Sequence, residues 1–358
     1  MMRRALELAS SVARTSPNPK VGAVVVHDGA VLAEGAHQGP PHPHAELVAL
    51  NGIDASGATL YTNLEPCSHT AGVDGRPRRA CCEAVVDAGI KRVVAAMKDP
   101  DPRVQGRGFE YLRAHGIEVE IGLLSEEARR INAAFVHHRT TGRPLVTLKL
   151  ALTLDGRIGA PDGSARWISG AEARRLVHER RAEADAVIVG AGTIASDDPQ
   201  LTARDVEAAH QPLRVVIDSS GRSSPEARVF AGEGDTLVAT TARAPHEAQV
   251  AWKEAGADVV VLADNERGVD LRELLTVLGA RRILDAYCEG GARLATSLLA
   301  DGLVDRLELH YAPKLVGDGG PAIGDLGVRT MSDAHTWRVV ETVTSGPDFL
   351  VTLERGRD

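Results

Sequence analysis

The sequence predicts an α/β protein of two domains, and three observations lead to this prediction. At 358 residues the chain is long enough for two domains that each bury a core. Short runs rich in Val, Leu and Ile alternate with helical patterns in both halves, which is typical of sheets with parallel strands. Residues 140–144, which include Gly142, are the best linker in the sequence. The predicted domains are therefore residues 1–143 and 144–358.

In the first half, apolar periodicity predicts helices and β-rich runs predict strands. The expected strands are 21–27, 31–37, 58–64 and 91–97, and the expected helices are 3–14, 45–50, 79–88 and one from about 125 to 139. Asp28-Gly29 between the first two strands is a strong hairpin signal. Ligands in parallel α/β sheets lie at the carboxyl ends of strands, and Pro66-Cys67 follows such a strand.

One stretch carries a pattern of metal chemistry. His44 stands two residues before Glu46, Cys67 follows a proline, and Cys81 and Cys82 come later. This order is typical of zinc deaminases, in which His and two Cys bind Zn²⁺ and the Glu transfers protons. We expect His44, Cys67 and Cys81 as ligands, although spacing alone leaves Cys81 and Cys82 open. The alternative is a core histidine with buried cysteines and no metal.

The second half continues the α/β pattern. The expected strands are 145–152, 186–189, 214–218, 236–240, 259–262 and 282–286, with further strand-like runs from Arg306 onward. No G-x-G-x-x-G fingerprint follows a first strand. Two glycine-containing stretches, 190–193 and 289–292, follow strands and lead into helical patterns. Their backbone N–H groups would suit a phosphate, and the alternative is a plain strand-to-helix turn.

Composition limits the partners. The net charge is −8 and the sequence has no dense basic block, so no duplex nucleic acid is expected. No apolar run is long enough for a membrane span, and Glu7 interrupts what a signal peptide would need. Three of the four Cys are clustered, which suits a metal site in a reducing cytosol better than disulfides. We therefore expect a cytoplasmic protein.

The first half resembles the riboflavin-biosynthesis deaminases. The similarity lies in residues 15–22, Pro66-Cys67-Ser68-His69 with 75–77, 89–94 and 99–108. Thirteen residues separate Cys67 from Cys81, a longer spacing than P-C-x-x-C, and residues 70–74 stand where that family has about one residue. The resemblance implies a cytidine-deaminase-like three-layer α/β/α domain. It also implies a pocket for a pyrimidine ribose phosphate lined by Asn18, His37, His69 and Arg76.

The second half resembles the reductase half of the bifunctional members of this family. The matching segments are 149–157, 167–169, 192–193, 197–202 and 289–291. The resemblance implies a dihydrofolate-reductase-like α/β domain that uses NADPH. The nucleotide contacts that it implies are Leu152, Trp167, Thr193, Asp197, Gly291, Ala292, Arg293, Leu294, Ala295, Thr296 and Ser297. The implied substrate contacts are Ala165, Arg181, Leu201, Arg204 and Glu289, with the two arginines placed for a phosphate.

Each of these assignments has a structural alternative. Asn18 between prolines is typical of a turn, and Arg181 has arginine neighbours that suggest a solvated helix face. Trp167 would suit simple core packing. Lys149 and Asp155 would suit a structural ion pair near the sheet.

The sequence thus predicts a bifunctional enzyme that acts on small pyrimidine ribotides. The first half would deaminate a 2,5-diamino-6-(phosphoribosylamino)pyrimidinone, and the second would reduce the ribosyl chain to ribityl with NADPH. One alternative is a nucleic-acid deaminase, such as a tRNA adenosine deaminase. Another is a catalytically dead second half that binds a ligand or mediates oligomerisation. Exposed strand edges would allow a homodimer, and no residue identifies the proton donor of the reduction.

Overall fold

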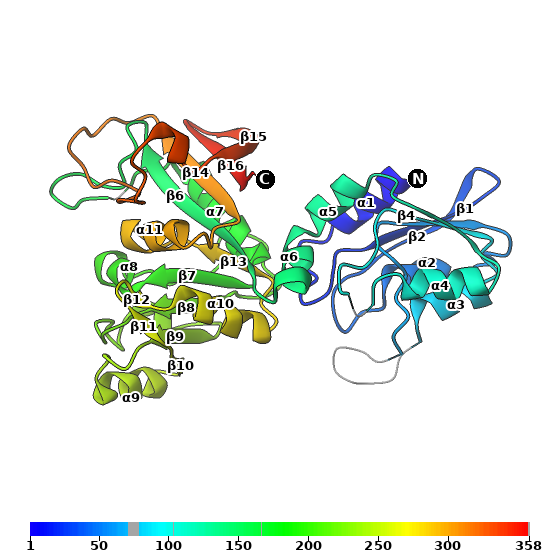
Figure 1. The fold of residues 1–358 in the computed structure, drawn as a ribbon, viewed down its shortest axis with the longest axis horizontal. Coiled ribbons are helices and arrows are strands. Elements are labelled where there is room, and N and C mark those ends of the chain that lie inside the picture. The colour runs from blue at the N-terminus through cyan, green and yellow to red at the C-terminus, as the bar shows by residue number, and fades with distance from the viewer. Residues whose placement is uncertain (71–78, 103, 166, 357–358) are drawn as a thin grey trace. The chain divides into compact units, whose positions relative to one another are not determined.

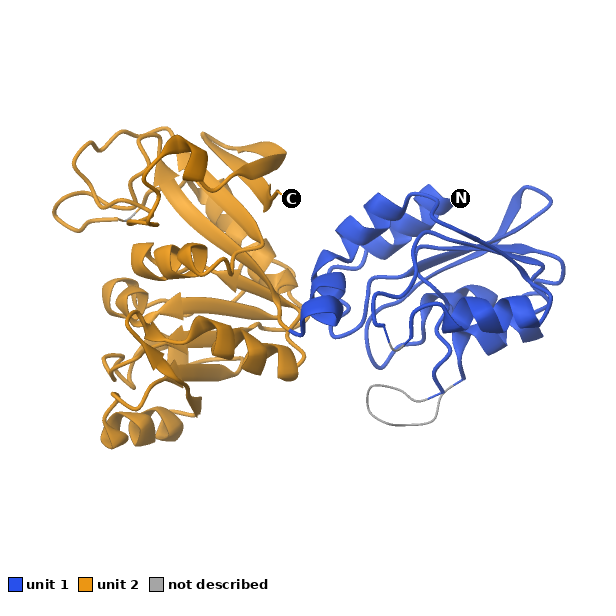
Figure 2. Ribbon diagram, in the orientation of Figure 1, with its two compact units in different colours: residues 1–142 blue, residues 143–358 orange. Residues whose placement is uncertain are grey.

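The computed structural model describes residues 1–356, with gaps at 71–78, 103 and 166. The chain divides into two compact units, Met1–Gly142 and Arg143–Asp358, which are coloured separately in Figure 2. The predicted boundary lies one residue from this division. Each unit has its own sheet and hydrophobic core, and each is described by itself.

The first unit is built on a five-stranded sheet in the order β2-β1-β3-β4-β5. Its strands β1, β2 and β4 are labelled in Figure 1. Its strands are β1 (Gly22–His27), β2 (Ala30–Ala36), β3 (Thr59–Thr62), β4 (Arg92–Ala95) and β5 (Glu118–Ile121). Its helices are α1 (Met2–Ser10), α2 (Ala45–Leu50), α3 (Cys81–Asp87), α4 (Arg107–Ala114), α5 (Ser125–Ile131) and α6 (Ala133–Thr141). β1 pairs antiparallel with β2 and β3, whereas β3, β4 and β5 run parallel. The predicted hairpin is confirmed.

Helices cover both faces of this sheet, as a three-layer α/β/α fold requires. Gly35 pairs with the residue after Gly22, so the two glycines face opposite sides of the sheet. A Cβ atom on Gly22 would lie 2.1 Å from the carbonyl oxygen of Ala5 in α1. A Cβ atom on Gly35 would lie 2.3 Å from the carbonyl oxygen of Ala45 in α2. The two helices therefore pack with their main chains directly against opposite faces, which places the start of α2 close to the sheet.

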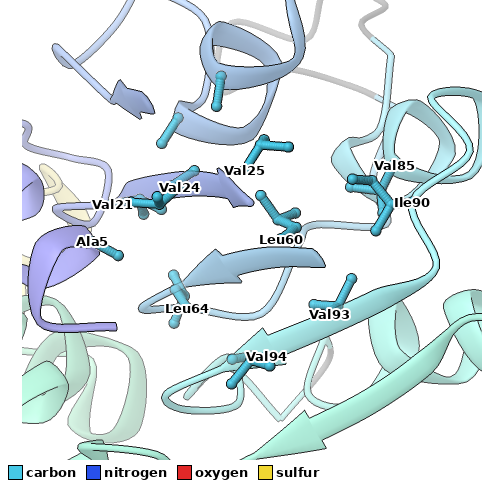
Figure 3. Packing of buried hydrophobic residues seen from close by; sticks show 14 of the residues in the cluster. Ala5, Val21, Val24, Val25, Leu60, Leu64, Val85, Ile90, Val93 and Val94 are labelled. Atoms are coloured by element: carbon cyan, nitrogen blue, oxygen red, sulfur yellow. The ribbon is translucent and has the colours of Figure 1, made fainter. Parts of the chain in front are cut away.

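The core of the first unit is aliphatic. Val24, Leu60 and Val93 come from three neighbouring strands and belong to one buried cluster, shown in Figure 3. Val85 of α3 packs in the same cluster, so this helix is fixed against the sheet. Burying aliphatic side chains contributes roughly 1.5–3 kcal/mol each. The core thus provides a rigid base for the residues at the carboxyl end of β3 and the start of α3.

Two helix predictions for the first unit were wrong in their extent. The helix expected from about 125 to 139 is interrupted at Asn132, between α5 and α6. The Asn132 side chain donates to the carbonyl of Lys20 at 2.9 Å and accepts from its N–H at 2.8 Å, so this residue is drawn out of the helical path. The first helix ends at Ser10, where the Ser11 hydroxyl donates to the carbonyl of Leu8 and competes with the helical backbone.

The second unit contains a nine-stranded sheet in the order β10-β9-β8-β7-β13-β6-β14-β16-β15. Its strands are β6 (Leu145–Thr153), β7 (Ala186–Gly190), β8 (Leu213–Ile217), β9 (Thr236–Thr240), β10 (Asp258–Val261), β13 (Asp285–Cys288), β14 (Arg306–Ala312), β15 (Trp337–Ser345) and β16 (Asp348–Arg355). A separate two-stranded ribbon consists of β11 (Asp264–Asn265) and β12 (Gly268–Val269). Its helices are α7 (Ala171–Glu183), α8 (Ala191–Asp197), α9 (His246–Glu254), α10 (Leu271–Ala280) and α11 (Ala292–Ala300). Within this nine-stranded sheet, neighbouring strands along the row β10-β9-β8-β7-β13-β6-β14 run parallel, and the pairs β14–β16 and β16–β15 are antiparallel.

One strand of the second unit begins later than predicted. The sequence indicated residues 282–286, but β13 starts at Asp285. Arg282 has φ 64, a left-handed conformation that closes the turn after α10 and cannot belong to a strand.

In the part of the chain that the structure describes, no helix combines the length and apolar character needed to cross a membrane.

Candidate active sites

The side chains of the predicted metal motif meet in the first unit. His44 is the N-cap residue of α2, Cys67 follows β3, and Cys81 is the first residue of α3. Their candidate ligand atoms all lie within 4.8 Å of one another. The Nδ1 atom of His44 is 3.5 Å from the Sγ atom of Cys67 and 3.3 Å from that of Cys81. Zn²⁺ bound tetrahedrally at ordinary Zn–N and Zn–S lengths would separate such atoms by about 3.6 Å. The three residues therefore fit a zinc ion.

The geometry separates the two adjacent cysteines. Consecutive residues on a helix point about 100° apart, so only one of them can face His44. Cys82 lies in the hydrophobic core, and its backbone N–H donates to the carbonyl of Cys67 at 3.1 Å. Burial raises the pKa of the Cys82 thiol to about 11. A hydrogen bond from Cys81 lowers the pKa of the Cys67 thiol to about 3, which favours the thiolate that binds metals.

Glu46 lies beside this centre in the first turn of α2 and is buried. Within the described residues, its Oε2 atom has no hydrogen-bond partner. Burial raises the pKa of the Glu46 carboxyl, and the nearby Cys67 adds to the increase. A buried carboxylate with a raised pKa and an unpaired oxygen is suited to accept and release a proton.

Asn18 and His37, two of the residues assigned to the pyrimidine pocket, lie next to the metal centre. The Nδ1 atom of His37 is 2.8 Å from the carbonyl oxygen of Pro43, so this nitrogen carries the proton. The Nε2 atom then accepts from the Nδ2 group of Asn18 at 3.0 Å. The ring of His37 also packs edge-to-face against His44, with centroids 5.1 Å apart. His37 therefore fixes the segment that presents His44.

The other two residues assigned to this pocket are His69 and Arg76. His69 is exposed in the loop that follows Cys67. Arg76 and most of the inserted stretch 70–74 lie outside the described residues.

In the second unit, a buried group of charges joins α7 to the sheet. Arg181 donates from Nε to one Glu289 oxygen at 2.6 Å and from Nη2 to the other at 3.0 Å. Its Nη1 group donates to the carbonyl of Thr202 at 3.2 Å. Arg181 is 8% exposed, so the interpretation as a solvated helix face was wrong. The Nζ atom of Lys149 lies 3.9 Å from Glu289.

These contacts also replace the ion pair suggested for Lys149 and Asp155. Lys149 pairs with Glu289, whereas Asp155 accepts from the Thr153 hydroxyl at 2.6 Å and from the Gly317 N–H at 2.6 Å. Burial lowers the pKa of Lys149, and Glu289 opposes that shift. Burial alone would raise the pKa of Glu289, but Arg181 and Lys149 outweigh it and lower the pKa. Glu289 is therefore held ionised.

The residues assigned to the nucleotide fall into two groups. Thr193 and Asp197 lie on α8, and Gly291 is the N-cap residue of α11. A Cβ atom on Gly291 would lie 3.8 Å from the Thr193 hydroxyl, so the two helices meet at these residues. The side chains of Leu152, Leu294 and Ala295 pack in the core. Only the backbone groups of these three residues can face a ligand, whereas Ala292 is half-buried and Arg293 is exposed at the helix start.

Several other predicted contacts have local roles. The Thr296 hydroxyl donates to the carbonyl of Ala292 at 2.6 Å and accepts from the N–H of Gly324, while Ser297 lies in the same helix. Trp167 is 62% exposed, so the core-packing alternative was wrong, and the guanidinium of Arg174 stacks on its ring at 4.5 Å. Ala165 is also exposed.

Near the substrate contacts of the second unit, Leu201 is buried and Arg204 is exposed. Sequence reasoning overlooked two residues around these sites. Lys314 donates to the carbonyls of Trp167 and Ile168 at 2.6 and 3.0 Å. Glu65, directly before Pro66, binds backbone groups of a distant segment. Its position two residues before Cys67, a predicted metal ligand, was the signal that could have identified it.

Comparisons with known proteins agree with this arrangement. Residues 144–351 match the family described as RibD C-terminal domain. Residues 1–97 match the family described as cytidine and deoxycytidylate deaminase zinc-binding region. The chain is 40% identical over 357 residues to the riboflavin biosynthesis protein RibD of Aquifex aeolicus, with 98% of this chain and 97% of that protein covered. It is 39% identical to the protein of that name from Escherichia coli, with 98% of each covered.

Solved structures show the same similarity. The chain matches Acinetobacter baumannii RibD, form 1, with a TM-score of 0.89 and 34% identity, covering 99% of this chain and 98% of that chain. It also matches a diaminohydroxyphosphoribosylaminopyrimidine deaminase/5-amino-6-(5-phosphoribosylamino)uracil reductase from Thermotoga maritima. That match has a TM-score of 0.85 and 36% identity, and it covers 99% of this chain and 97% of that chain.

Proposed function

Because the chain belongs to the RibD family of bifunctional riboflavin-biosynthesis deaminases and reductases, we propose how its own residues divide the two reactions. The first unit deaminates 2,5-diamino-6-(5-phosphoribosylamino)pyrimidin-4(3H)-one. The second unit reduces the ribosyl chain of the resulting 5-amino-6-(5-phosphoribosylamino)uracil to ribityl. The observation that carries this proposal is the buried carboxylate of Glu46, with one oxygen that has no partner among the described residues, beside three ligand atoms that fit zinc.

In the deaminase, His44, Cys67 and Cys81 hold the zinc. When bound, zinc supplies a Lewis acid that makes water nucleophilic near neutral pH. Glu46 accepts the proton of the attacking water and passes it to the departing ammonia, and its raised pKa makes both transfers accessible. His37 keeps the segment before His44 in place, and Asn18 lies beside it to orient the pyrimidine. The family resemblance also assigns His69 and Arg76 to the ribotide pocket, and Arg76 lies outside the described residues.

In the reductase, NADPH supplies the hydride. Thr193 and Asp197 bind the nucleotide together with the backbone N–H groups at the start of α11, where the helix dipole favours phosphate. Glu289 lies in the substrate site, and Arg181 and Lys149 keep it ionised. The Nε, Nη1 and Nη2 groups of Arg181 already donate hydrogen bonds to Glu289 and Thr202. Arg204 is therefore the better residue to bind the substrate phosphate. Arg181 orients Glu289 instead.

The substrates are free ribotides and the enzyme is cytosolic. A net charge of −8 is unfavourable for a nucleic-acid substrate, which argues against a tRNA deaminase. None of the four cysteines forms a disulfide, as expected in a reducing compartment. Strand β15 ends the nine-stranded sheet, and this edge is available for a homodimer.

Two assays on the full-length protein test the proposal. Zinc-loaded protein should release ammonia from the diaminopyrimidinone ribotide and not from tRNA, and chelation of zinc should abolish this release. The deaminated product should then cause loss of the NADPH absorbance. Ammonia release from tRNA, or unchanged ammonia release after complete removal of zinc, would refute the deaminase assignment. Absence of NADPH oxidation with authentic product would refute the reductase assignment.

A further inference from the structure

Glu65 is a buried carboxylate in the first unit that the two reactions do not use directly. It lies between β3 and Cys67, and it accepts three hydrogen bonds from backbone N–H groups. Its Oε2 atom accepts from Asp99 at 3.1 Å and from Gly106 at 2.9 Å. Its Oε1 atom accepts from Gly108 at 2.9 Å. Three such bonds offset much of the cost of burying a charge.

Two of these donors belong to the start of α4. Gly106 is the N-cap residue of that helix, and glycine has no side chain with which to cap it. The first N–H groups of a helix have no partner within the helix, and the helix dipole favours a negative charge there. Glu65 supplies both the acceptor and the charge from a segment 41 residues earlier in the chain. The N-terminus of α4 is therefore capped by Glu65, the residue before Pro66.

Helix α4 also packs directly against the segment that carries Cys67. A Cβ atom on Gly108 would lie 2.1 Å from the carbonyl oxygen of Pro66, so the two backbones touch. On the next peptide, the carbonyl of Cys67 accepts the Cys82 N–H at 3.1 Å. Cys67 is thus held between the starts of α4 and α3.

We propose that Glu65 is a positioning residue for the deaminase, which fixes Cys67 relative to His44 and Cys81 by joining its segment to α4. This inference rests on the proposed zinc ligation by Cys67. The Sγ atom of Cys67 lies 3.5 Å from the Nδ1 atom of His44, close to the spacing that zinc requires. Because Cys67 follows a loop rather than sitting inside a helix, an external anchor is needed to keep that spacing.

The test compares Glu65→Gln with Asp218→Asn in the full-length protein. Asp218 is a matched control in the second unit, since it is also buried and accepts three backbone N–H groups, those of Ser220, Gly221 and Ser223. Competition with a chromophoric chelator gives the zinc affinity, and the thiolate-to-metal absorption of the Co²⁺-substituted protein reports on the ligand geometry. The deaminase and reductase rates are measured on the same samples.

Glu65→Gln keeps one carbonyl oxygen but places an NH₂ group against backbone donors. We expect it to weaken zinc binding about 10- to 100-fold, to change the cobalt spectrum and to lower the deaminase kcat/KM, with reductase activity unchanged. Asp218→Asn should leave zinc affinity and the cobalt spectrum unchanged. Gly108→Ala provides a second variant, because its methyl group displaces the carbonyl of Pro66 while alanine favours the helix, and it should shift the same readouts in the same direction.

Cys67→Ser separates this inference from the proposal beneath it. If Cys67→Ser keeps stoichiometric zinc, the ligand assignment fails and the role of Glu65 fails with it. If Cys67→Ser loses zinc while Glu65→Gln and Gly108→Ala keep wild-type affinity and cobalt spectra, the ligand set stands and the positioning role is overturned.

Discussion

At the metal centre of the first unit, the buried Glu46 has an oxygen without a partner among the described residues, whereas in the second unit Glu289 uses both oxygens on Arg181. The pKa of Glu46 is raised by burial, and that of Glu289 is lowered because two cations outweigh its burial. Glu46 thus keeps one oxygen without a partner among the described residues, whereas both oxygens of Glu289 are paired. Of these two carboxylates, Glu46 is the one suited to proton transfer.

The two sites also differ in how the chain assembles them. Helix α2, the segment after β3 and helix α3 bring His44, Cys67 and Cys81 together from one stretch of sequence. Lys149 lies on β6, Glu289 directly follows the parallel neighbour β13, and Arg181 comes from a helix more than a hundred residues away from Glu289. A local motif therefore indicates the first site, whereas the second depends on the tertiary fold.

The largest expected effect is at the adjacent thiols. Cys81→Ser should abolish stoichiometric zinc and deaminase activity, because a serine hydroxyl is a poor ligand for zinc. Cys82→Ser should keep zinc and lose about 1–3 kcal/mol of stability, since it places a hydroxyl in the apolar core. Elemental analysis measures the zinc content of both variants, and denaturant unfolding measures their stability. The reverse pattern, with zinc lost only in Cys82→Ser, would exchange the two assignments.

Glu46→Gln tests whether the Glu46 carboxylate carries the proton. Deamination should slow by about 10²- to 10⁴-fold with zinc and reductase activity retained. The folded-state pKa of Glu46 lies above its unfolded value, so ionisation costs stability as the pH rises through the folded value. The neutral amide removes this cost, and the thermal midpoint at neutral pH should not fall. Ammonia-release kinetics and thermal unfolding check both points. Near-normal turnover would exclude Glu46 as the proton carrier.

Glu289→Gln tests the paired carboxylate of the second unit. It leaves Arg181 buried without its counter-ion, which should cost about 3–5 kcal/mol of stability. Reductase kcat/KM should fall about 10- to 100-fold, with deaminase activity unchanged. The matched control is Glu179→Gln in the exposed pair with Arg175, which should cost at most about 1 kcal/mol. Denaturant unfolding and NADPH oxidation supply the measurements, and equal losses in the two variants would contradict the structural argument.

The smallest effect is a pH dependence in the first unit. Burial, with repulsion from Glu65 and Asp101, raises the pKa of Asp99 to about 6. Protonated Asp99 contributes fully to the free energy of unfolding below the unfolded-state pKa. This contribution, at most about 3 kcal/mol, is lost as the pH rises toward 6. Asp99→Asn can still accept the Asp101 N–H and should flatten stability between about pH 4 and 6. Unfolding of the first unit across this range checks the prediction. If the unfolding free energy of Asp99→Asn changes with pH as steeply as that of the wild type, ionisation of Asp99 carries no cost in stability.

Much of the first unit could be predicted because its signals are local. The hairpin at Asp28-Gly29 and the helix that follows His44 depend on neighbouring residues, and both were confirmed. The break at Asn132 could not be predicted, because it depends on hydrogen bonds to Lys20, more than a hundred residues earlier in the chain. The partners of Arg181 were missed for the same reason.

The sequence by itself determined the α/β class, and it predicted the types of metal ligand and a general acid–base residue, because each follows from residue chemistry and short spacing. Only the tertiary structure decided which of Cys81 and Cys82 faces His44, since that depends on how α3 is rotated against the core. It also decided that Lys149 pairs with Glu289 rather than with Asp155. Ion pairs form between charged side chains that are close in space. The order of the strands in the sheet, rather than the distance along the chain, determines which charged residues are close.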